Sequence, residues 1–153
     1  MNRSDIEQKG YFLIREYRNG DFEQVAGLWV ETGMGNSARS DNEKTILDSI
    51  NLGGKLLILE ERSTGRICGT SWMTCDGRRI HLHHFGILQA LQGKKLAHLL
   101  LGESLRFVKE KGYQVKLEVH STNTKAINLY KKHGFEYLGD YDVYIIRDIS
   151  RIK

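Results

Sequence analysis

Residues 80–111 have the sequence IHLHHFGILQALQGKKLAHLLLGESLRFVKEK, which predicts a strand, a turn and a long helix in succession. Apolar and ring-bearing side chains alternate over Ile80–Phe85, as they do along a strand. Beyond the turn, apolar residues recur at steps of three and four over Leu96–Val108, which is typical of an amphipathic helix. Gly112 follows at the place where a glycine commonly ends a helix.

The turn before this helix has the chemistry of an anion-binding site. Lys94 and Lys95 lie beside Gly93, immediately before the predicted helix. The first turn of a helix has backbone N–H groups without partners in the helix and a partial positive charge, so it attracts phosphate. Taken alone, two lysines beside a glycine are more typical of a solvated loop. The phosphate interpretation therefore depends on the sequence that follows.

A second strand, turn and helix follow this helix. Val115–His120 has the alternation of a strand, Ser121–Thr124 is polar, and Ala126–Phe135 is predicted to be helical. Strand alternation places Glu118 and His120 on one face and Leu117 and Val119 on the other.

The two blocks together resemble the GNAT superfamily of acetyl-CoA-dependent N-acetyltransferases. The family's pyrophosphate loop has the pattern Gln/Arg-x-x-Gly-x-Gly/Ala, which Gln92 and Ala97 match, whereas Lys95 stands where the middle glycine is usual. The second block is similar to the family at Leu117-Glu118-Val119, Asn123, Ala126, Leu129-Tyr130 and Gly134-Phe135. The resemblance is strongest over residues 80–139 and rests on both blocks in this order and spacing.

The rest of the chain supplies the other elements of an α+β fold. Capping patterns at Asp21/Gln24 and Ser40/Glu43 predict two helices, which end near Gly33 and Gly53. The remaining strands are expected at Phe12–Glu16, Lys55–Glu61, Ile67–Thr74, Arg79–Ile87, Glu136–Gly139 and Tyr144–Arg147. This order predicts a mixed, mostly antiparallel sheet with flanking helices. The resemblance implies the same order, with fourth and fifth strands that part to admit the cofactor.

The length and composition of the chain are compatible with this fold. A chain of 153 residues fits one N-acetyltransferase domain over 1–153. Met1–Gly10 is polar and the apolar runs are short, so we expect no membrane segment and a cytoplasmic location. Cys68 and Cys75 lie too far apart along one strand for a disulfide and are expected to be reduced thiols.

The net charge of +4 raises the question of nucleic acid as a partner. The basic pairs Arg78-Arg79, Lys94-Lys95 and Lys131-Lys132 are scattered and form no sustained basic face. The phosphates of coenzyme A explain local lysines more economically, so we do not expect nucleic acid.

The resemblance implies where acetyl-CoA binds. Backbone groups of Phe85, Gly86 and Ile87 would pair with the pantetheine arm as an extra strand does, and Gly86 also allows close approach of another backbone. The pyrophosphate cradle would comprise Gln92, Gly93, Lys94, Lys95, Leu96, Ala97 and His98. Lys95 is compatible with this cradle if its backbone is helical. Asn123 would bond the pantetheine arm, cap the following helix, or do both.

The resemblance also implies the catalytic residues Tyr130 and Glu118. A tyrosine hydroxyl near the sulfur can protonate the departing thiolate, and Tyr130 holds that place, although a packing role on an amphipathic helix is the alternative. In the ribosomal-protein N-terminal acetyltransferase branch, which this chain resembles most, a glutamate at the position of Glu118 is the general base. His120, His83, His84 and ordered water remain rival bases, because an imidazole titrates near neutrality.

The histidines of His81-Leu82-His83-His84 also admit a metal interpretation. His81 and His83 share a strand face, but no third ligand lies at suitable spacing, so we expect no metal.

We therefore expect an acetyl-CoA-dependent N-acetyltransferase that transfers acetyl directly to a primary amine. A silent acyl-CoA-binding or regulatory domain is the alternative, and a basic nucleic-acid-binding module is a third. A small-molecule amine, a protein N-terminus and a lysine are all open as acceptors, and the sequence is compatible with a homodimer.

Overall fold

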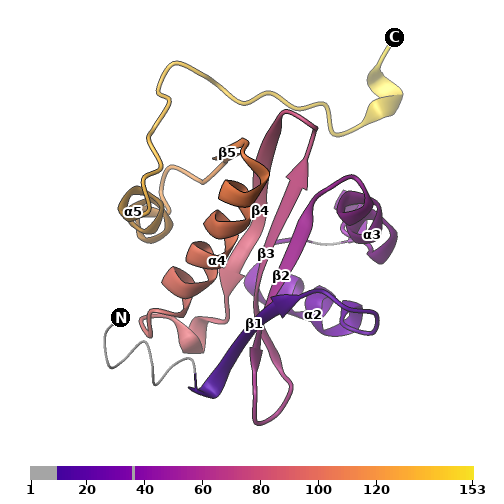
Figure 1. Cartoon of the computed structure of the whole chain (residues 1–153). Coiled ribbons are helices and arrows are strands. Elements are labelled where there is room, and N and C mark those ends of the chain that lie inside the picture. The colour runs from indigo at the N-terminus through magenta and orange to yellow at the C-terminus, as the bar shows by residue number, and fades with distance from the viewer. Residues whose placement is uncertain (1–9, 36) are drawn as a thin grey trace.

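The computed structural model describes residues 10–35 and 37–153 and contains one sheet with helices on both of its faces (Figure 1). The strands are β1 (Phe12–Glu16), β2 (Lys55–Glu61), β3 (Ile67–Cys75), β4 (Arg79–Ile87) and β5 (Gln114–Leu117). The five strands lie in chain order, antiparallel except that β5 runs parallel to β4. The expected mixed, mostly antiparallel α+β sheet is confirmed.

Helices of the two halves cover opposite faces of this sheet. The α-helices are α2 (Phe22–Thr32), α3 (Glu43–Asn51), α4 (Leu96–Lys111) and α5 (Thr124–Lys132). Short 3₁₀ turns are η1 (Ser37–Arg39), η2 (Gln89–Leu91) and η3 (Ile149–Arg151). In Figure 1, α2 and α3 lie on one side of the sheet and α4 and α5 on the other. Among these helices, none has the length and apolar character needed to cross a bilayer.

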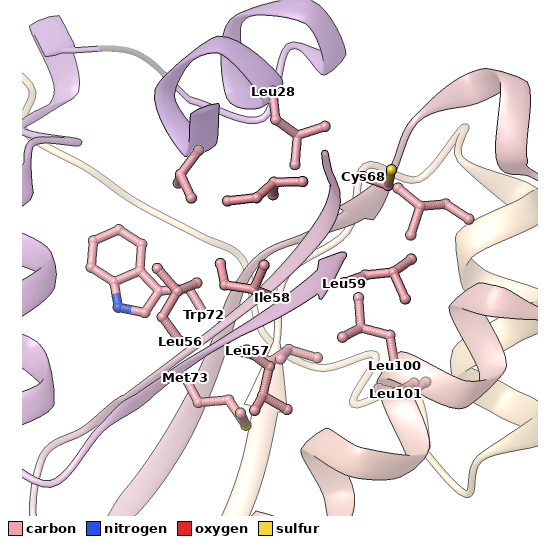
Figure 2. Close-up of a cluster of buried hydrophobic side chains, with 14 of the residues drawn as sticks. Leu28, Leu56, Leu57, Ile58, Leu59, Cys68, Trp72, Met73, Leu100 and Leu101 are labelled. Atoms are coloured by element: carbon pink, nitrogen blue, oxygen red, sulfur yellow. The ribbon is translucent and has the colours of Figure 1, made fainter. Parts of the chain in front are cut away.

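The core explains the apolar run of β2. Leu56, Leu57, Ile58 and Leu59 are all buried, although neighbouring side chains point to opposite faces of a strand. A continuous apolar run is stable only where both faces of the sheet are covered. Figure 2 shows this arrangement, with Leu28 of α2 on one side of the strands and Leu100 and Leu101 of α4 on the other.

A bulge interrupts the pairing of β3 with β4. Thr70 faces Gly86 and Trp72 faces His83, so β4 has one residue more than β3 across this interval. His84 lies in the bulge with φ of 41°, a left-handed value that non-glycine residues rarely adopt. The bulge sends the consecutive side chains of His83 and His84 to the same side, where both rings approach Trp72.

The pairing of β4 with β5 ends early. It runs only from Arg79 opposite Gln114 to Leu82 opposite Leu117, whereas β4 continues to Ile87. The last five residues of β4 therefore have no partner strand on this side among the described residues. The expectation that the fourth and fifth strands part is confirmed.

Three local predictions are wrong. The helix cap of α3 is Asn42, not Ser40, and its side chain accepts from the Thr45 N–H at 3.0 Å. Asp21 is the N-cap residue of α2, as predicted, but the predicted capping box does not form: its carboxylate makes no cap hydrogen bond and pairs with the Arg15 guanidinium at 2.7 and 2.9 Å. β5 ends at Leu117, so the predicted strand Val115–His120 is too long.

The two strands predicted at Glu136–Gly139 and Tyr144–Arg147 do not form in the described chain. Residues 136–153 contain only the 3₁₀ turn η3. Their backbone–backbone hydrogen bonds are local, such as that from the Arg151 N–H to the Asp148 carbonyl at 3.2 Å. Alternating apolar residues give a segment strand composition, but a strand also needs a neighbour with free backbone groups.

Leu100 provides a test of this packing. It is fully buried between α4 and the sheet, so Leu100→Ala should lower the free energy of unfolding by about 2–5 kcal/mol through lost apolar contact and a residual cavity. Leu52→Ala is the matched control, because Leu52 is 74% exposed and should cost no more than about 0.5 kcal/mol. Urea unfolding of both variants measures the difference, and equal costs would contradict this description of the core.

Candidate active site

The parted end of β4 forms one wall of the candidate site. Phe85, Gly86 and Ile87 lie beyond the last residue pair with β5, and within ranges 10–35 and 37–153 no backbone hydrogen bond joins them to that strand. Their outward-facing N–H and carbonyl groups can therefore pair with an extended ligand. A Cβ atom at Gly86 would lie 2.7 Å from Sδ of Met34, so a larger residue there would require this flexible side chain to move.

The turn before α4 forms a second wall. Gly93 has φ of 81° and Lys95 has φ of 59°, so both are left-handed. The expectation that Lys95 has a helical backbone is therefore wrong: it holds the conformation that glycine adopts most easily, at the position where the family usually has glycine. Lys94 and Lys95 both lie at the surface.

The first turn of α4 offers hydrogen-bond donors at the same place. The Leu99 N–H donates to the Lys95 carbonyl at 3.2 Å, which closes the first turn of the helix. The N–H groups of Leu96, Ala97 and His98 precede that bond and have no carbonyl one turn earlier in the helix. Together with the positive end of the helix dipole, these donors suit a phosphate group.

The start of α5 approaches the same turn. Asn123 caps α5 by accepting from the Ala126 N–H at 3.1 Å, which confirms the capping role predicted for it. Nζ of Lys125 donates to Oε1 of Gln92 at 2.7 Å and so links the two turns. Sequence reasoning missed Lys125. Its only signal was a lysine in the first turn of a helix, where acidic residues are more usual.

Tyr130 lies on α5 against the end of β4. It is buried, and its ring packs edge-on against Phe85 and Phe135, with centroids 5.9 and 5.6 Å apart. Burial raises the pKa of Tyr130 to about 12, so the hydroxyl keeps its proton at neutral pH. The packing role that was the alternative for Tyr130 is thus observed, and the buried protonated hydroxyl is also suited to the predicted role of proton donor.

His81 and His83 form a pair on the sheet face that carries Trp72. Their ring centroids are 3.9 Å apart, and Nε2 of His83 lies 2.8 Å from Oγ1 of Thr74. Burial, together with the nearby His81 and His84, lowers the pKa of His83 to about 4. Burial also lowers the pKa of His81, against the opposing charge of Glu118. Both rings are therefore neutral at pH 7.

His84 is held separately. Its ring lies between those of Trp29 and Trp72, with centroid distances of 4.4 and 5.2 Å. Nε2 of His84 is 3.1 Å from Oδ1 of Asp41, an ion-pair distance without the geometry of a hydrogen bond. The His84 carbonyl accepts from Thr70, whose hydroxyl in turn accepts from the Trp29 indole. These contacts stabilise the bulge, and the sequence held no signal for Asp41.

Glu118 and His120, two of the residues predicted as candidates for the general base, lie at the surface. Leu117 and Val119 pack toward the core, whereas Glu118 and His120 face solvent, so the predicted alternation is confirmed even though the strand ends at Leu117. Nδ1 of His120 bonds the Thr122 hydroxyl at 2.8 Å. Glu118 is close enough to His81 to act on its charge, which places it on the side of the histidine pair.

A pocket of about 340 Å³ lies on this side of the sheet, and we call it the hairpin pocket. It is lined by the β3–β4 turn, with Arg78, Arg79 and Asp76, and by His81 and Lys116 on the neighbouring strands. The pocket adjoins the histidine pair through His81. It could therefore receive part of an acceptor molecule. His98 lies elsewhere, with Nδ1 at 3.0 Å from Nε2 of His133 at the end of α5.

The lowered pKa of His83 predicts acid sensitivity. The folded protein holds this ring neutral down to about pH 4, whereas an unfolded chain protonates it near 6.5, so the unfolded state binds more protons in this window. The free energy of unfolding should fall as pH drops from 6.5 toward 4, and His83→Asn should reduce this fall by about 1–3 kcal/mol. Urea unfolding at several pH values measures it. The control His120→Gln, at an exposed site, should leave the slope unchanged, and equal slopes for wild type and His83→Asn would contradict the assignment.

Comparison with known proteins adds to this geometry. A family model described as "Acetyltransferase (GNAT) family" matches residues 11–135. A GNAT-family acetyltransferase from Staphylococcus aureus Mu50 is similar with a TM-score of 0.71 and 19% identity, over 82% of this chain and 83% of that one. The ribosomal-protein-S18-alanine N-acetyltransferase from Escherichia coli has a TM-score of 0.68 and 18% identity, over 82% and 77%. AAC(6')-Iy, in complex with the bisubstrate analogue CoA-S-monomethyl-acetylneamine, has a TM-score of 0.68 and 17% identity, over 90% and 99%.

Proposed function

This chain belongs to the GNAT acetyltransferase family, and we propose that it transfers the acetyl group of acetyl-CoA directly to a primary amine. The observation that carries the proposal is the early end of the β4–β5 pairing, which leaves Phe85–Ile87 without a partner strand on the β5 side, beside two helix N-termini. An extended amide-bearing arm and a diphosphate are the two chemical features that such a site suits. Acetyl-CoA has both.

The residues of the parted strands and turns fit this cosubstrate. Backbone groups of Phe85, Gly86 and Ile87 would bond the amides of the pantetheine arm. N–H groups of the turn that runs from Gln92 to His98 would hold the pyrophosphate, with Lys94, Lys95 and Lys125 supplying charge near it. Asn123 would bond the arm through the amide N–H₂ that its capping hydrogen bond leaves available.

Tyr130 is proposed as the general acid. Bound acetyl-CoA supplies an acetyl group activated as a thioester. When an amine nitrogen bonds to the acetyl carbon and the carbon–sulfur bond breaks, the Tyr130 hydroxyl donates its proton to the departing sulfur. The raised pKa supports this role, because the hydroxyl is protonated before the reaction and regains its proton readily afterwards.

Glu118 is proposed as the general base, acting directly or through water. The acceptor must lose a proton before its nitrogen attacks, since amines are mostly protonated at neutral pH. Glu118 lies on the side of His81 and the hairpin pocket, which supports the assignment. His83 is a weaker candidate, because its ring is largely buried and Nε2 is engaged by the Thr74 hydroxyl at 2.8 Å. His120, His84 and ordered water are the other candidates that the test below separates.

The alternative function is that of a catalytically silent domain that binds acyl-CoA or regulates another protein. In either case, we propose that the chain is a single domain. Thiol release from acetyl-CoA, measured over a panel of small amines, lysine peptides and peptides with free N-termini, separates the two. Release that depends on an amine supports the enzyme, whereas binding of acetyl-CoA without release supports the silent domain. We propose a cytoplasmic location, which the two free cysteines Cys68 and Cys75 support.

The phosphate turn yields the first functional prediction. Lys95→Gly keeps the left-handed backbone and removes one charge, so the Kd for acetyl-CoA should rise by no more than about threefold. Lys94→Ala should have a similarly small effect. Ala97→Leu should raise the Kd by about tenfold or more, because it crowds the backbone donors. Isothermal titration measures all three, with thermal unfolding as a check on folding. If the lysine variants lose more affinity than Ala97→Leu, side-chain charge carries the site.

Tyr130→Phe tests the acid. The ring contacts with Phe85 and Phe135 remain in this variant, so the Kd for acetyl-CoA should be nearly unchanged. Turnover should fall by at least about tenfold, as it does when a general acid is lost. Steady-state rates at saturating amine provide the measurement. An unchanged kcat would assign Tyr130 to packing alone.

Glu118→Gln tests the base. The variant should lower kcat/KM most near neutral pH, and the deficit should shrink as pH approaches the pKa of the acceptor amine, since a neutral amine needs no base. His120→Gln is the matched comparison on the same face of the segment. A wild-type pH profile for Glu118→Gln, with a lost acidic limb for His120→Gln, would assign the base to His120. Wild-type profiles for both would favour His84 or ordered water.

A further inference from the structure

The hairpin pocket concentrates positive charge on the α2/α3 side of the sheet. Arg78 and Arg79 come from the β3–β4 turn, and Lys116 comes from β5. The acidic residue of the pocket, Asp76, is already engaged. Its Oδ1 accepts from the backbone N–H groups of Arg78 and Arg79 at 2.8 and 2.7 Å, and its Oδ2 lies 3.3 Å from the Arg78 guanidinium. This carboxylate therefore offsets the charge of Arg78 and leaves two cations uncompensated.

Arg79 and Lys116 are those two cations. In the part of the chain that the structure describes, neither side chain forms an ion pair with an acidic residue. His81 lies beside them and is neutral at pH 7, because burial lowers its pKa and Lys116 adds to this effect against the charge of Glu118. A neutral imidazole can donate a ring N–H to a ligand. Two cations with a neutral donor have the chemistry that binds a carboxylate.

We propose that the hairpin pocket binds an anionic group of the acceptor, so that the chain prefers amines that carry a carboxylate at a distance from the nitrogen. This inference rests on the proposed acetyl transfer and names the class of acceptor for it. The planar guanidinium of Arg79 matches the two oxygens of a carboxylate, and Lys116 adds a point charge. An acceptor without an anionic group gains neither contact.

The order of groups along β4 and β5 places the two ends of such an acceptor. Glu118, the proposed base, follows Leu117, which is the last residue of β5 that pairs with β4, so it lies where the seam begins. Lys116 lies on the same strand face two residues earlier, about 7 Å away at the rise of a strand. Arg79 pairs with Gln114, which is displaced by about 13 Å. The amine and the anionic group are therefore about 7–13 Å apart.

A peptide N-terminus fits this separation. Extended residues advance by about 3.3–3.6 Å each, so a carboxylate two to three residues beyond the N-terminal one reaches the hairpin pocket. The α-amine of a free amino acid does not fit, because its amine and carboxylate are attached to the same carbon. An acidic side chain and the terminal carboxylate of a short peptide supply the same anionic group.

Thiol release with matched peptides tests the preference. One pair is Ala-Ala-Glu-Ala-amide and Ala-Ala-Gln-Ala-amide, and the other is Ala-Ala-Ala as the acid and as the amide. The acidic member should have a kcat/KM about five- to tenfold higher, and the ratio should shrink at high salt. A preference in the first pair alone identifies a side-chain carboxylate, and one in the second alone identifies a terminal carboxylate. Equal kcat/KM within both pairs overturns the inference and leaves acetyl transfer in place.

Charge reversal assigns the preference to the pocket. Arg79→Glu and Lys116→Glu should each abolish the preference for the glutamate peptide and favour Ala-Ala-Arg-Ala-amide instead. Arg66→Glu is the matched control, because this exposed residue precedes β3 and the hairpin pocket lies at the other end of that strand. It should keep the wild-type preference. All three side chains are exposed, so thermal unfolding should show folded variants. A wild-type preference in both pocket variants would also overturn the inference.

Binding separates this inference from the proposed reaction. If no peptide supports thiol release, acetyl transfer to N-termini fails, and isothermal titration of the same peptides in the presence of coenzyme A decides the role of the pocket. Tighter binding of the acidic peptides to wild type than to Arg79→Glu supports an anion site. Equal affinities of acidic and neutral peptides for wild type refute it.

Discussion

The early end of the β4–β5 pairing is the constraint on which the rest of the site depends. Only the first residues of β4, Arg79 to Leu82, are paired with β5, so the two strands part over the remaining length of β4. The bulge at His84 adds to this separation, because it turns the last part of β4 and is held in place by Trp29, Thr70 and Trp72. The sheet is paired continuously from β1 to β4 and opens at the β4–β5 seam, where backbone groups are available to a ligand.

The elements around this seam supply complementary chemistry. The N-terminal turns of α4 and α5 lie together, linked by the Gln92–Lys125 hydrogen bond, and they provide donors and positive charge. Tyr130 lies against Phe85 at the end of β4, so a buried, protonated hydroxyl lies beside the same strand. The histidine pair and the hairpin pocket occupy the α2/α3 side of β4. Cofactor groups and acceptor groups are thus presented from neighbouring parts of one strand.

Features that depend on local sequence could be predicted, whereas features that depend on distant contacts could not. The apolar repeat of α4 and its terminal Gly112 are local, and both are confirmed. The resemblance to the GNAT family supplied the parted strands and the residues of the phosphate turn. The left-handed backbone of Lys95 was missed, because this conformation is usually adopted by glycine and rarely by lysine. The contact between Asp41 and His84 and the absence of strands after α5 also depend on which segments meet in space, which apolar alternation does not specify.

Amide hydrogen exchange with and without acetyl-CoA tests the central claim most directly, because the claim is that unpaired backbone groups at the β4–β5 seam bind this molecule. Slower exchange is predicted at Phe85–Ile87 and at Leu96–His98 when acetyl-CoA is added. Amides of β2 should be unaffected, since that strand is paired on both sides. If acetyl-CoA binds and leaves exchange at the seam and at the first turn of α4 unchanged, or if it does not bind, the proposed cofactor site is contradicted.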